Sequence, residues 1–416
     1  MNNKINPEIR KNRMAEATLT VLKADKTPLA NQEVTVEQVR HKFLFGTAAF
    51  DLVPLTNGGF EGQKKEAADQ WVEKFLALCN SATLPFYWAR FEPERGKPLT
   101  KETQNAARWC LEHGLVTKGH PLCWHTLTAD WLLQMSNEEI LRAQIARIQR
   151  DVADFRGLIE MWDVLNEGVI MPVFDKYDNG ITRLCEEKGR IQTIKTMFET
   201  TRATNPSATL LLNDFDVSDA YDILVEGCLE AGVKIDVIGI QSHMHQGYWG
   251  VEKTLKVLSH FERFNLPIHF TETTLVSGHI MPPEIVDLND YQVTAEQWPS
   301  TPEGEERQAQ EAVTHYKTLF SHPLVEGIVW WDMSDAKWLN APGGLLRKDG
   351  SSKPAYDELL KLVKGEWWIS PTRLVTDENG KIRFDGFLGD YELAFDGRKS
   401  QFSLAKGNAT TIEVQL

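Results

Sequence analysis

The sequence predicts an α/β protein in which a (β/α)8 barrel, a TIM barrel, carries a small accessory β-sandwich. Over residues 41–366, short apolar and β-branched runs alternate with longer amphipathic stretches. Residues 1–40 and 367–416 instead hold short segments in which polar and apolar residues alternate. The first pattern is typical of strands and helices that alternate around a parallel sheet, and the second of strands with one face in solvent.

The central segment contains eight strand candidates. Amphipathic stretches such as KEAADQWVEKFLAL and EEILRAQIARIQRDVADF separate them and indicate helices. Eight successive strand–helix units favour a closed barrel over a doubly wound open sheet, which usually has fewer strands and often a glycine-rich phosphate turn. No GxGxxG or GxxxxGK[ST] motif is present. The strand candidates span residues 43–47, 79–85, 116–124, 159–167, 209–214, 236–243, 268–274 and 327–333.

The two ends of the chain are expected to form the sandwich. Residues 15–39 alternate on either side of Pro28, which predicts a hairpin of two strands. After Lys364, five more strands are expected in TRLVT, KIRFDGF, DYELAF, SQFSLA and TTIEVQL. Two and five make seven, the number in an immunoglobulin-like sandwich. The alternative is two separate short appendages.

The amino-acid composition makes some classes of binding partner unfavourable. The net charge of −14 makes nucleic acid and anionic membranes poor partners, because both need basic patches. No apolar run approaches the ~20 residues that span a bilayer, and no signal segment is visible. The sequence as it stands is expected to be cytoplasmic, or secreted if a signal was removed. Five cysteines without close pairs do not indicate a disulfide framework, and oligomeric state stays open.

Candidate catalytic residues lie where the strand candidates end. Barrel enzymes place their catalytic groups at the C-terminal ends of strands. Six consecutive strand candidates end here in His, Glu, Asn, Gln or Trp, which exposure to solvent alone does not require. These residues are His120 with the following Trp124 and His125, Asn166 and Glu167, Asn213 and Asp214, Gln241 and His243 with the following His245, Glu272, and Trp330, Trp331 and Asp332.

Glu167 and Glu272 form the pair on which a function is predicted. Each directly follows an apolar strand, so both are expected to point into the same mouth. Glycoside hydrolysis needs two carboxyl groups that flank the scissile bond. A separation of about 5–5.5 Å indicates retention of configuration and about 6.5–9.5 Å inversion, and the sequence does not choose between them. Taken singly, each Glu is equally well explained as a surface or structural carboxylate.

Three neighbours support or compete with this interpretation. Asn166 is placed to donate to a sugar hydroxyl, although Asn is also common in turns. His243 is placed to orient Glu272. The His243-x-His245 pattern also suggests a metal pair, which gives a metal-dependent hydrolase as one alternative. No cofactor is expected, and carbohydrate is the expected substrate.

Together these motifs resemble glycoside hydrolase family 10, the family of retaining endo-β-1,4-xylanases, from about Phe43 to Leu362. The resemblance implies retention, with Glu167 as acid/base, Glu272 as nucleophile and no catalytic metal. It also implies action on xylan-derived or related β-linked oligosaccharides. WDVLNE resembles the acid/base motif, and FTET the nucleophile motif I-T-E-x-D. GHPLCWHT, LLNDFD and IGIQSH match further motifs, at His120, Trp124, His125, Asn213, Asp214, Gln241 and His243.

The segment after the second strand departs from the family, which usually carries T-P-E-N-E-M-K-W-E there. This chain has ATLPFYWARFEPERG, in which Trp88 aligns and is expected to bind or orient substrate, but the sugar-binding Asn and Lys have no counterpart. Phe86, Tyr87 and Arg90 stand there instead and suggest an altered glycone pocket. Because loss of hydrogen-bonding groups changes which sugar is accepted, a non-xylan β-glycoside is one alternative substrate. A non-catalytic carbohydrate-binding barrel is another interpretation.

Two further segments differ from the family pattern. Residues 276–304 form a long, proline-containing loop, which either walls off one end of the cleft or only decorates the surface. In WWDMSDAKWL, Trp331 and Asp335 fit the family's W-G-x-x-D. Trp338 then comes one residue early, and Trp330 is the alternative residue to stack on a sugar.

Overall fold

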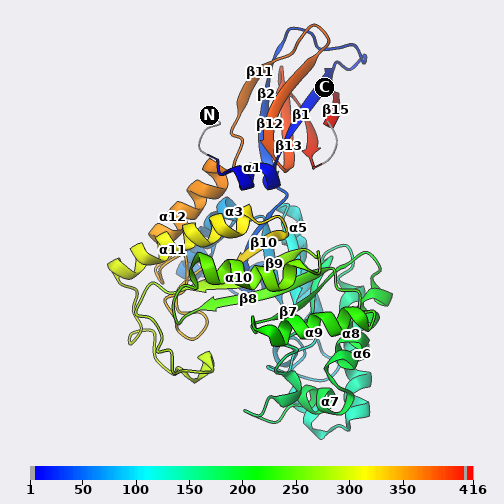
Figure 1. Cartoon of the computed structure of the whole chain (residues 1–416), viewed down its shortest axis with the longest axis vertical. Helices are drawn as coiled ribbons and strands as arrows, with labels where there is room; N and C mark the ends of the chain where they lie inside the picture. Colours follow the sequence, from blue (N-terminus) through cyan, green and yellow to red (C-terminus); the bar gives the residue numbers. More distant parts are fainter. Residues whose placement is uncertain (1–4, 407–409, 416) are drawn as a thin grey trace.

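A computed structural model describes residues 5–406 and 410–415. Its central part is a closed parallel barrel with the strand order β10-β3-β4-β5-β6-β7-β8-β9, which confirms the predicted TIM barrel (Figure 1). All eight expected strands are present, and their order around the barrel follows the chain. They are β3 (Leu44–Ala48), β4 (Ser81–Pro85), β5 (Val116–His120), β6 (Met161–Asn166), β7 (Thr209–Asp214), β8 (Val237–Met244), β9 (Ile268–Leu275) and β10 (Val325–Trp330).

Helices surround the barrel between the strands, and local sequence signals mark where several begin. Ser136 and Glu139 form a reciprocal capping box at the start of α6. Thr301 caps α11, in which Pro302 occupies the first turn. The longer helices are α3 (Gly62–Leu78), α5 (Thr100–Glu112), α6 (Asn137–Asp154), α8 (Arg190–Thr204), α9 (Asp219–Glu230), α10 (Gly250–Glu262) and α11 (Pro302–Ser321). The shorter ones are α1 (Pro7–Arg13), α2 (Leu52–Thr56), α4 (Trp88–Phe91), η1 (Asp130–Gln134), η2 (Met171–Val173), α7 (Gly180–Lys188), η3 (Leu288–Asp290), α12 (Pro354–Lys361) and the π-helical turn η4 (Leu362–Glu366).

The N-terminal and C-terminal strands lie together beyond one end of the barrel (Figure 1). They form two sheets, with the strand orders β12-β1-β15 and β11-β2-β13-β14. Apolar side chains from both sheets share one core, which includes Leu19, Val36, Tyr391 and Leu404. The strands are β1 (Met14–Leu22), β2 (Glu33–His41), β11 (Thr372–Val375), β12 (Lys381–Phe387), β13 (Gly389–Phe395), β14 (Arg398–Leu404) and β15 (Thr410–Gln415).

The expected N-terminal hairpin is wrong. Strands β1 and β2 lie in different sheets. The backbone pairing beside the turn joins β1 to the residues before β2: Leu22 bridges Pro28, and the Leu29 N–H donates to the Val21 carbonyl at 2.9 Å. Each strand pairs instead with C-terminal strands on both sides. Alternation along a strand predicts which face is buried, but it does not predict the neighbouring strand.

Arg13, at the end of a helix that the sequence did not predict, joins the sandwich to the barrel. Its guanidinium donates to the carbonyls of Phe320, His322 and Val325, the last at 2.6 Å. These carbonyls lie between the end of α11 and the start of β10, so the sandwich contacts the N-terminal end of the barrel strands. Catalytic groups of barrel enzymes gather at the opposite end. None of the helices within the described ranges has the length and apolarity needed to cross a bilayer.

Candidate active site

Glu167 and Glu272 face one mouth at the C-terminal end of the barrel, joined by a network of amides. The Asn213 side chain donates to Glu272 Oε1 at 2.9 Å and to Asn166 Oδ1 at 2.7 Å. Gln241 donates to Glu167 Oε1 and to Asn166 Oδ1, both at 3.2 Å. Three predicted site residues on β6, β7 and β8 therefore hold the two carboxylates in a single cluster.

Glu167 is surrounded mainly by uncharged groups. Trp124 Nε1 donates to its Oε2 at 2.8 Å, and Asn166 Nδ2 donates to its Oε1 at 3.2 Å. His125 Nε2 lies 3.8 Å from Oε2, and burial lowers the pKa of His125 to about 3, so this imidazole is neutral. Burial raises the pKa of Glu167 to about 8, and the negative charges of Asp214 and Glu272 add to the rise. Glu167 is therefore protonated at neutral pH.

The backbone of Glu167 is strained. Its φ of 59° lies in the left-handed region, which residues with a side chain rarely adopt. Such a conformation costs about 1–3 kcal/mol and persists only where surrounding contacts hold it. Here the Glu167 N–H donates to the Asn213 carbonyl at 2.7 Å, and its carbonyl accepts from Met171 N–H at 3.2 Å. The fold thus maintains an unfavourable backbone conformation in order to aim this carboxyl into the mouth.

Glu272 has the opposite electrostatic environment. It is 4% exposed, and burial alone would raise its pKa. The hydrogen bond from His243 Nε2, 3.0 Å from Oε2, and the nearby His120, whose Nε2 lies 3.9 Å from Oε1, outweigh that effect. The pKa of Glu272 is therefore held below its usual value, and the group is ionised. His243 Nδ1 in turn lies 3.0 Å from the Thr274 hydroxyl.

Sequence reasoning missed a buried charged pair behind His120. Asp163 Oδ2 lies 2.7 Å from His120 Nδ1 and 2.6 Å from Lys118 Nζ. Burial would raise the pKa of Asp163, but Lys118 and His120 lower it below the usual value. Lys118 and Asp163 each interrupt an apolar strand with a charge, which is the signal that would have found them. The pair orients His120 toward Glu272.

Aromatic rings line the side of the mouth formed by β4 and β10. The rings of Tyr87 and Trp331 lie 5.5 and 5.4 Å from that of His120. The Trp338 ring lies 4.4 Å from His243. Tyr87 has a pKa raised well above its usual value, first by burial and then by the charge of Glu272. Arg90 is exposed, with its guanidinium 5.9 Å from the centre of the Tyr87 ring.

Two residues expected at the substrate lie elsewhere. Phe86 is completely buried against Phe155 and Trp162. Trp88 is also buried, donates to Glu92 at 3.1 Å and lies under the Arg147 guanidinium. The expectation that Phe86 and Trp88 contact substrate is therefore corrected. The chain leaves regular strand geometry at Pro85, so alternation no longer predicts which side chains face the mouth.

The alternative placement of Trp330 is also wrong. Trp330 is 1% exposed and donates its indole N–H to the Gly343 carbonyl at 2.9 Å. Asp335 pairs with Lys353 at 2.5 Å in the interior. Trp331 and Trp338 are the members of this segment whose rings lie beside His243, the residue that contacts Glu272.

The His243–His245 pattern does not form a metal pair. Both ring nitrogens of His243 are engaged by Glu272 and Thr274. His245 is buried, with its ring against Trp298 and Trp338. Throughout the part of the chain that the structure describes, no three His, Cys, Asp or Glu residues converge as metal ligands.

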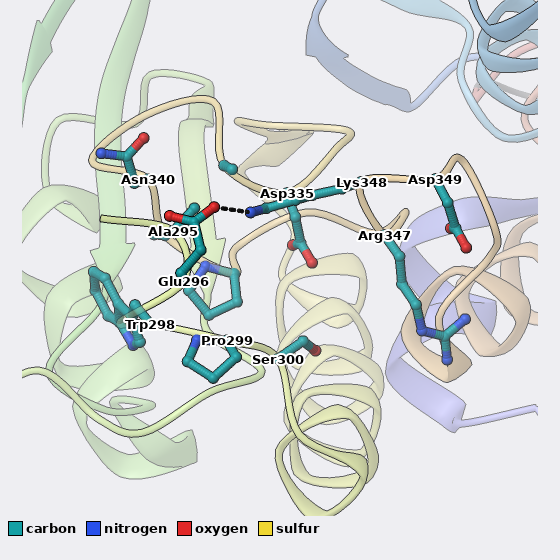
Figure 2. Close-up of a pocket in the computed structure, with 13 residues that line it drawn as sticks. Ala295, Glu296, Trp298, Pro299, Ser300, Asp335, Asn340, Arg347, Lys348 and Asp349 are labelled. Carbon is teal, nitrogen blue, oxygen red and sulfur yellow. Dashed lines mark ion pairs between the residues drawn. The ribbon is translucent and has the colours of Figure 1, made fainter. Parts of the chain in front are cut away.

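A separate cavity of about 410 Å³ lies between the 295–300 and 335–349 segments (Figure 2). Neither Glu167 nor Glu272 lines it. Lys348 pairs there with Glu296 at 3.6 Å, and Arg347 pairs with Glu305 outside the cavity. Asp335, which also lines the cavity, pairs with Lys353.

Two carboxyl groups with opposite shifts of pKa, on the C-terminal rim of a TIM barrel, define the kind of site that glycoside hydrolases use. Residues 61–362 match Glycosyl hydrolase family 10, and the chain belongs to that family.

Comparisons with individual proteins agree with this family. The chain is 23% identical to Endo-1,4-beta-xylanase 1 of Arabidopsis thaliana, over 92% of its own length and 36% of that protein. It is 25% identical to the anti-sigma-I factor RsgI6 of Acetivibrio thermocellus, over 93% and 46% of the two chains. The chain thus spans between a third and a half of these relatives.

Solved structures show the same fold. Xylanase 10B from Thermotoga petrophila RKU-1, in complex with xylobiose, matches with a TM-score of 0.62 and 20% identity, over 78% of this chain and 95% of that one. Native xylanase 10B from Thermotoga maritima matches with a TM-score of 0.61 and 20% identity, over 78% and 96%.

Proposed function

We propose that this chain is a retaining β-glycoside hydrolase, with Glu167 as general acid/base and Glu272 as nucleophile. The observation that carries the proposal is the separation of the two pKa values within one hydrogen-bonded cluster. Glu167, with a pKa of about 8, keeps its proton, whereas Glu272 is ionised. Acid and nucleophile need these opposite protonation states in the resting enzyme.

The reaction runs in two displacements. In the first, Glu272 attacks the anomeric carbon while Glu167 gives its proton to the departing glycosidic oxygen, so a glycosyl–enzyme ester forms and the leaving group departs neutral. In the second, the ionised Glu167 takes a proton from water, the water oxygen attacks the anomeric carbon, and Glu272 departs as carboxylate. Two inversions retain the configuration.

Neighbouring groups prepare both steps. His243 and Asn213 each donate to a different oxygen of Glu272, which sets the attacking carboxylate in place. Trp124 and Gln241 hold the Glu167 carboxyl in its strained position. Preorganised donors of this kind act without reorganising at the moment of reaction. Trp331 and Trp338 supply flat faces for the sugar ring.

The substrate we propose is a β-1,4-linked xylo-oligosaccharide or a related β-linked oligosaccharide, cleaved in the manner of an endo-β-1,4-xylanase. Several relatives are named endo-1,4-beta-xylanases, which supports this choice. Tyr87 and Arg90 occupy the region where the family usually carries Asn and Lys, so the glycone preference is expected to differ from that of the relatives.

A panel of aryl β-glycosides tests the proposal: xylosyl, xylobiosyl, glucosyl, cellobiosyl and arabinosyl substrates, alongside xylan. We expect hydrolysis with retention, followed by NMR of the newly formed anomer. Glu272→Ala should lower kcat/KM by at least about 10³-fold, because the nucleophile is lost. Glu303→Ala, which removes an exposed carboxyl from α11, is the matched control.

Undiminished hydrolysis by Glu272→Ala would contradict the assignment, and an inverted product would contradict the mechanism. Binding of the sugars without turnover would favour a carbohydrate-binding barrel instead. The relative named as an anti-sigma-I factor makes that outcome worth measuring by calorimetry.

A further inference from the structure

The segment 276–301, between β9 and α11, is a loop with internal packing, which we call the strap. Its centre is Trp298, 1% exposed, whose indole N–H donates to the His279 carbonyl at 2.9 Å. The Tyr291 ring lies against Trp298 at 4.9 Å, and its hydroxyl is 2.8 Å from His279 Nε2. An apolar core, to which Ala341 of the neighbouring 335–349 segment also contributes, gives the strap a defined shape.

The strap is attached to the rim of the barrel next to β8. The Met281 N–H donates to the His245 carbonyl at 2.9 Å. Gln246 donates to the carbonyls of Pro282 and Ile285, at 3.0 and 2.7 Å. These bonds hold its first half over the end of the strand that supplies Gln241 and His243.

The tip of the strap reaches across the mouth to the segment that follows β6. Lys176 Nζ lies 2.7 Å from Asp287 Oδ2 and 2.6 Å from Asp290 Oδ1. Around the barrel, β6 and β9 are separated by β7 and β8. The ion pairs therefore join the loops after β6 and β9 on the side of the barrel rim that holds β7 and β8.

The segment that holds Lys176 also contacts the side of the general acid. The Phe174 ring lies 4.4 Å from the ring of His125, which approaches Glu167 at 3.8 Å. The Tyr177 ring packs on Phe174 at 4.9 Å and is 47% exposed. Tyr177, linked to Glu167 through Phe174 and His125, offers an exposed aromatic face that is suited to stacking on a sugar or aryl group.

The two sides of the mouth accordingly take different parts of a substrate. The rings of Tyr87, Trp331 and Trp338 follow β4 and β10 in the chain and lie beside His120 and His243, the two histidines next to Glu272. The sugar that becomes bound to Glu272 is therefore expected on that side. The leaving group then extends in the opposite direction, over β7 and β8, where it meets the strap.

We infer that Lys176, Asp287 and Asp290 determine specificity by restricting the leaving-group side of the cleft to a short sugar chain or aryl group. This inference rests on the proposed hydrolase function. The ion pairs are partly exposed, so they are weak and screened by salt. Longer leaving groups are therefore disfavoured rather than excluded.

The test compares kcat/KM for xylo-oligosaccharides of increasing length with kcat/KM for an aryl β-xylobioside, on the full chain. Lys176→Ala and the double variant Asp287→Asn/Asp290→Asn should each raise the long-to-short ratio about two- to fivefold and leave the aryl substrate unaffected. The unmodified protein should show the same rise in high salt.

Two further variants give the inference its controls. Lys176→Asp combined with Asp287→Lys and Asp290→Lys restores opposite charges and should return the ratio toward that of the unmodified protein. Lys65→Ala removes an exposed lysine paired with Asp69 on α3 and should change nothing.

An unchanged ratio in the strap variants, with the aryl substrate still cleaved, overturns the inference and leaves the proposed function standing. Failure of the unmodified protein to cleave any substrate overturns the proposed function instead. In that event, calorimetry measures the binding of the same oligosaccharides to the unmodified protein and to the strap variants. An unchanged ratio of long-chain to short-chain affinity then overturns the inference.

Discussion

The ends of β6 and β9 present the same side chain, a glutamate, to the same mouth in two different environments. Glu167 is contacted by an indole and two amides, and the carboxyl groups of Asp214 and Glu272 nearby raise its pKa. Glu272 is contacted by His243 and lies near His120. The first environment favours the protonated acid and the second the anion. The comparison teaches that neighbours, and not residue type, divide the roles of two identical groups.

Both carboxyl groups are buried, so burial does not explain the difference between them. Burial acts on each pKa in the same upward direction. The two pKa values differ because carboxyl groups lie near Glu167, whereas histidine side chains lie near Glu272 and one of them hydrogen-bonds to it. Variants that exchange these neighbours are therefore the sharpest way to test the division of roles.

Glu167→Gln should have the largest effect. It removes the proton donor, so kcat for substrates with poor leaving groups should fall about 10²–10⁴-fold. Formation of the glycosyl–enzyme from an activated aryl glycoside should fall much less, because that leaving group needs no proton. Steady-state and burst kinetics on leaving groups of graded acidity measure the difference. An equal loss of activity with all leaving groups would contradict the assignment of Glu167 as the acid. Glu94→Gln, at an exposed site, is the control.

The unmodified protein should show a bell-shaped pH profile of kcat/KM. Because Glu167 must be protonated, activity should fall as pH rises through about 8. Because Glu272 must be ionised, activity should also fall as pH drops through its lowered pKa. His243→Asn removes a group that lowers the Glu272 pKa, so the acid limb should move to higher pH while the alkaline limb stays.

The control for His243→Asn is His260→Asn, which alters a histidine beside Asp219 on the outer helices. An acid limb that stays in place would show that His243 does not set the ionisation of Glu272.

Trp124→Phe should have the smallest effect, and it should change the pKa of Glu167 rather than that of Glu272. It removes a hydrogen bond that lowers the Glu167 pKa, so that pKa should rise. The alkaline limb should then move upward by about one pH unit or less, the equivalent of one hydrogen bond. A downward shift would contradict the environment described for Glu167. Trp109→Phe, where the indole stacks on His113 far from the mouth, is the control.

The barrel and the residues at its rim were predictable because both follow from local pattern. Asn166, Asn213, Gln241 and Glu272 each follow apolar residues of a short strand, and the C-terminal ends of such strands converge in a barrel. Where the chain leaves regular geometry, as at Phe86 after Pro85, alternation fails to tell an inward side chain from an outward one.

Contacts between segments far apart in the sequence could not be predicted, because a local pattern does not say which segments become neighbours. The Lys118–Asp163 pair depends on two strands standing side by side, and the ion pairs of Lys176 depend on the path of a long loop. The strand partners of β1 and β2 depend on segments more than 300 residues further along the chain. The sequence pattern predicts which residues are buried or polar, but it does not predict which residues pack against one another.

The pairing of β1 with β12 and β15 has a consequence for how the molecule is made. Strand β1 leaves the ribosome more than 350 residues before its partners β12 and β15 are made, as the pairing of Leu19 with Ile382 and Ile412 illustrates. Contacts between residues so far apart in sequence form slowly, because a long loop has to close first. All the barrel strands are synthesised before the sandwich can close, so Leu19 and Val21 remain open to water, and to other chains, until β12 and β15 have been made.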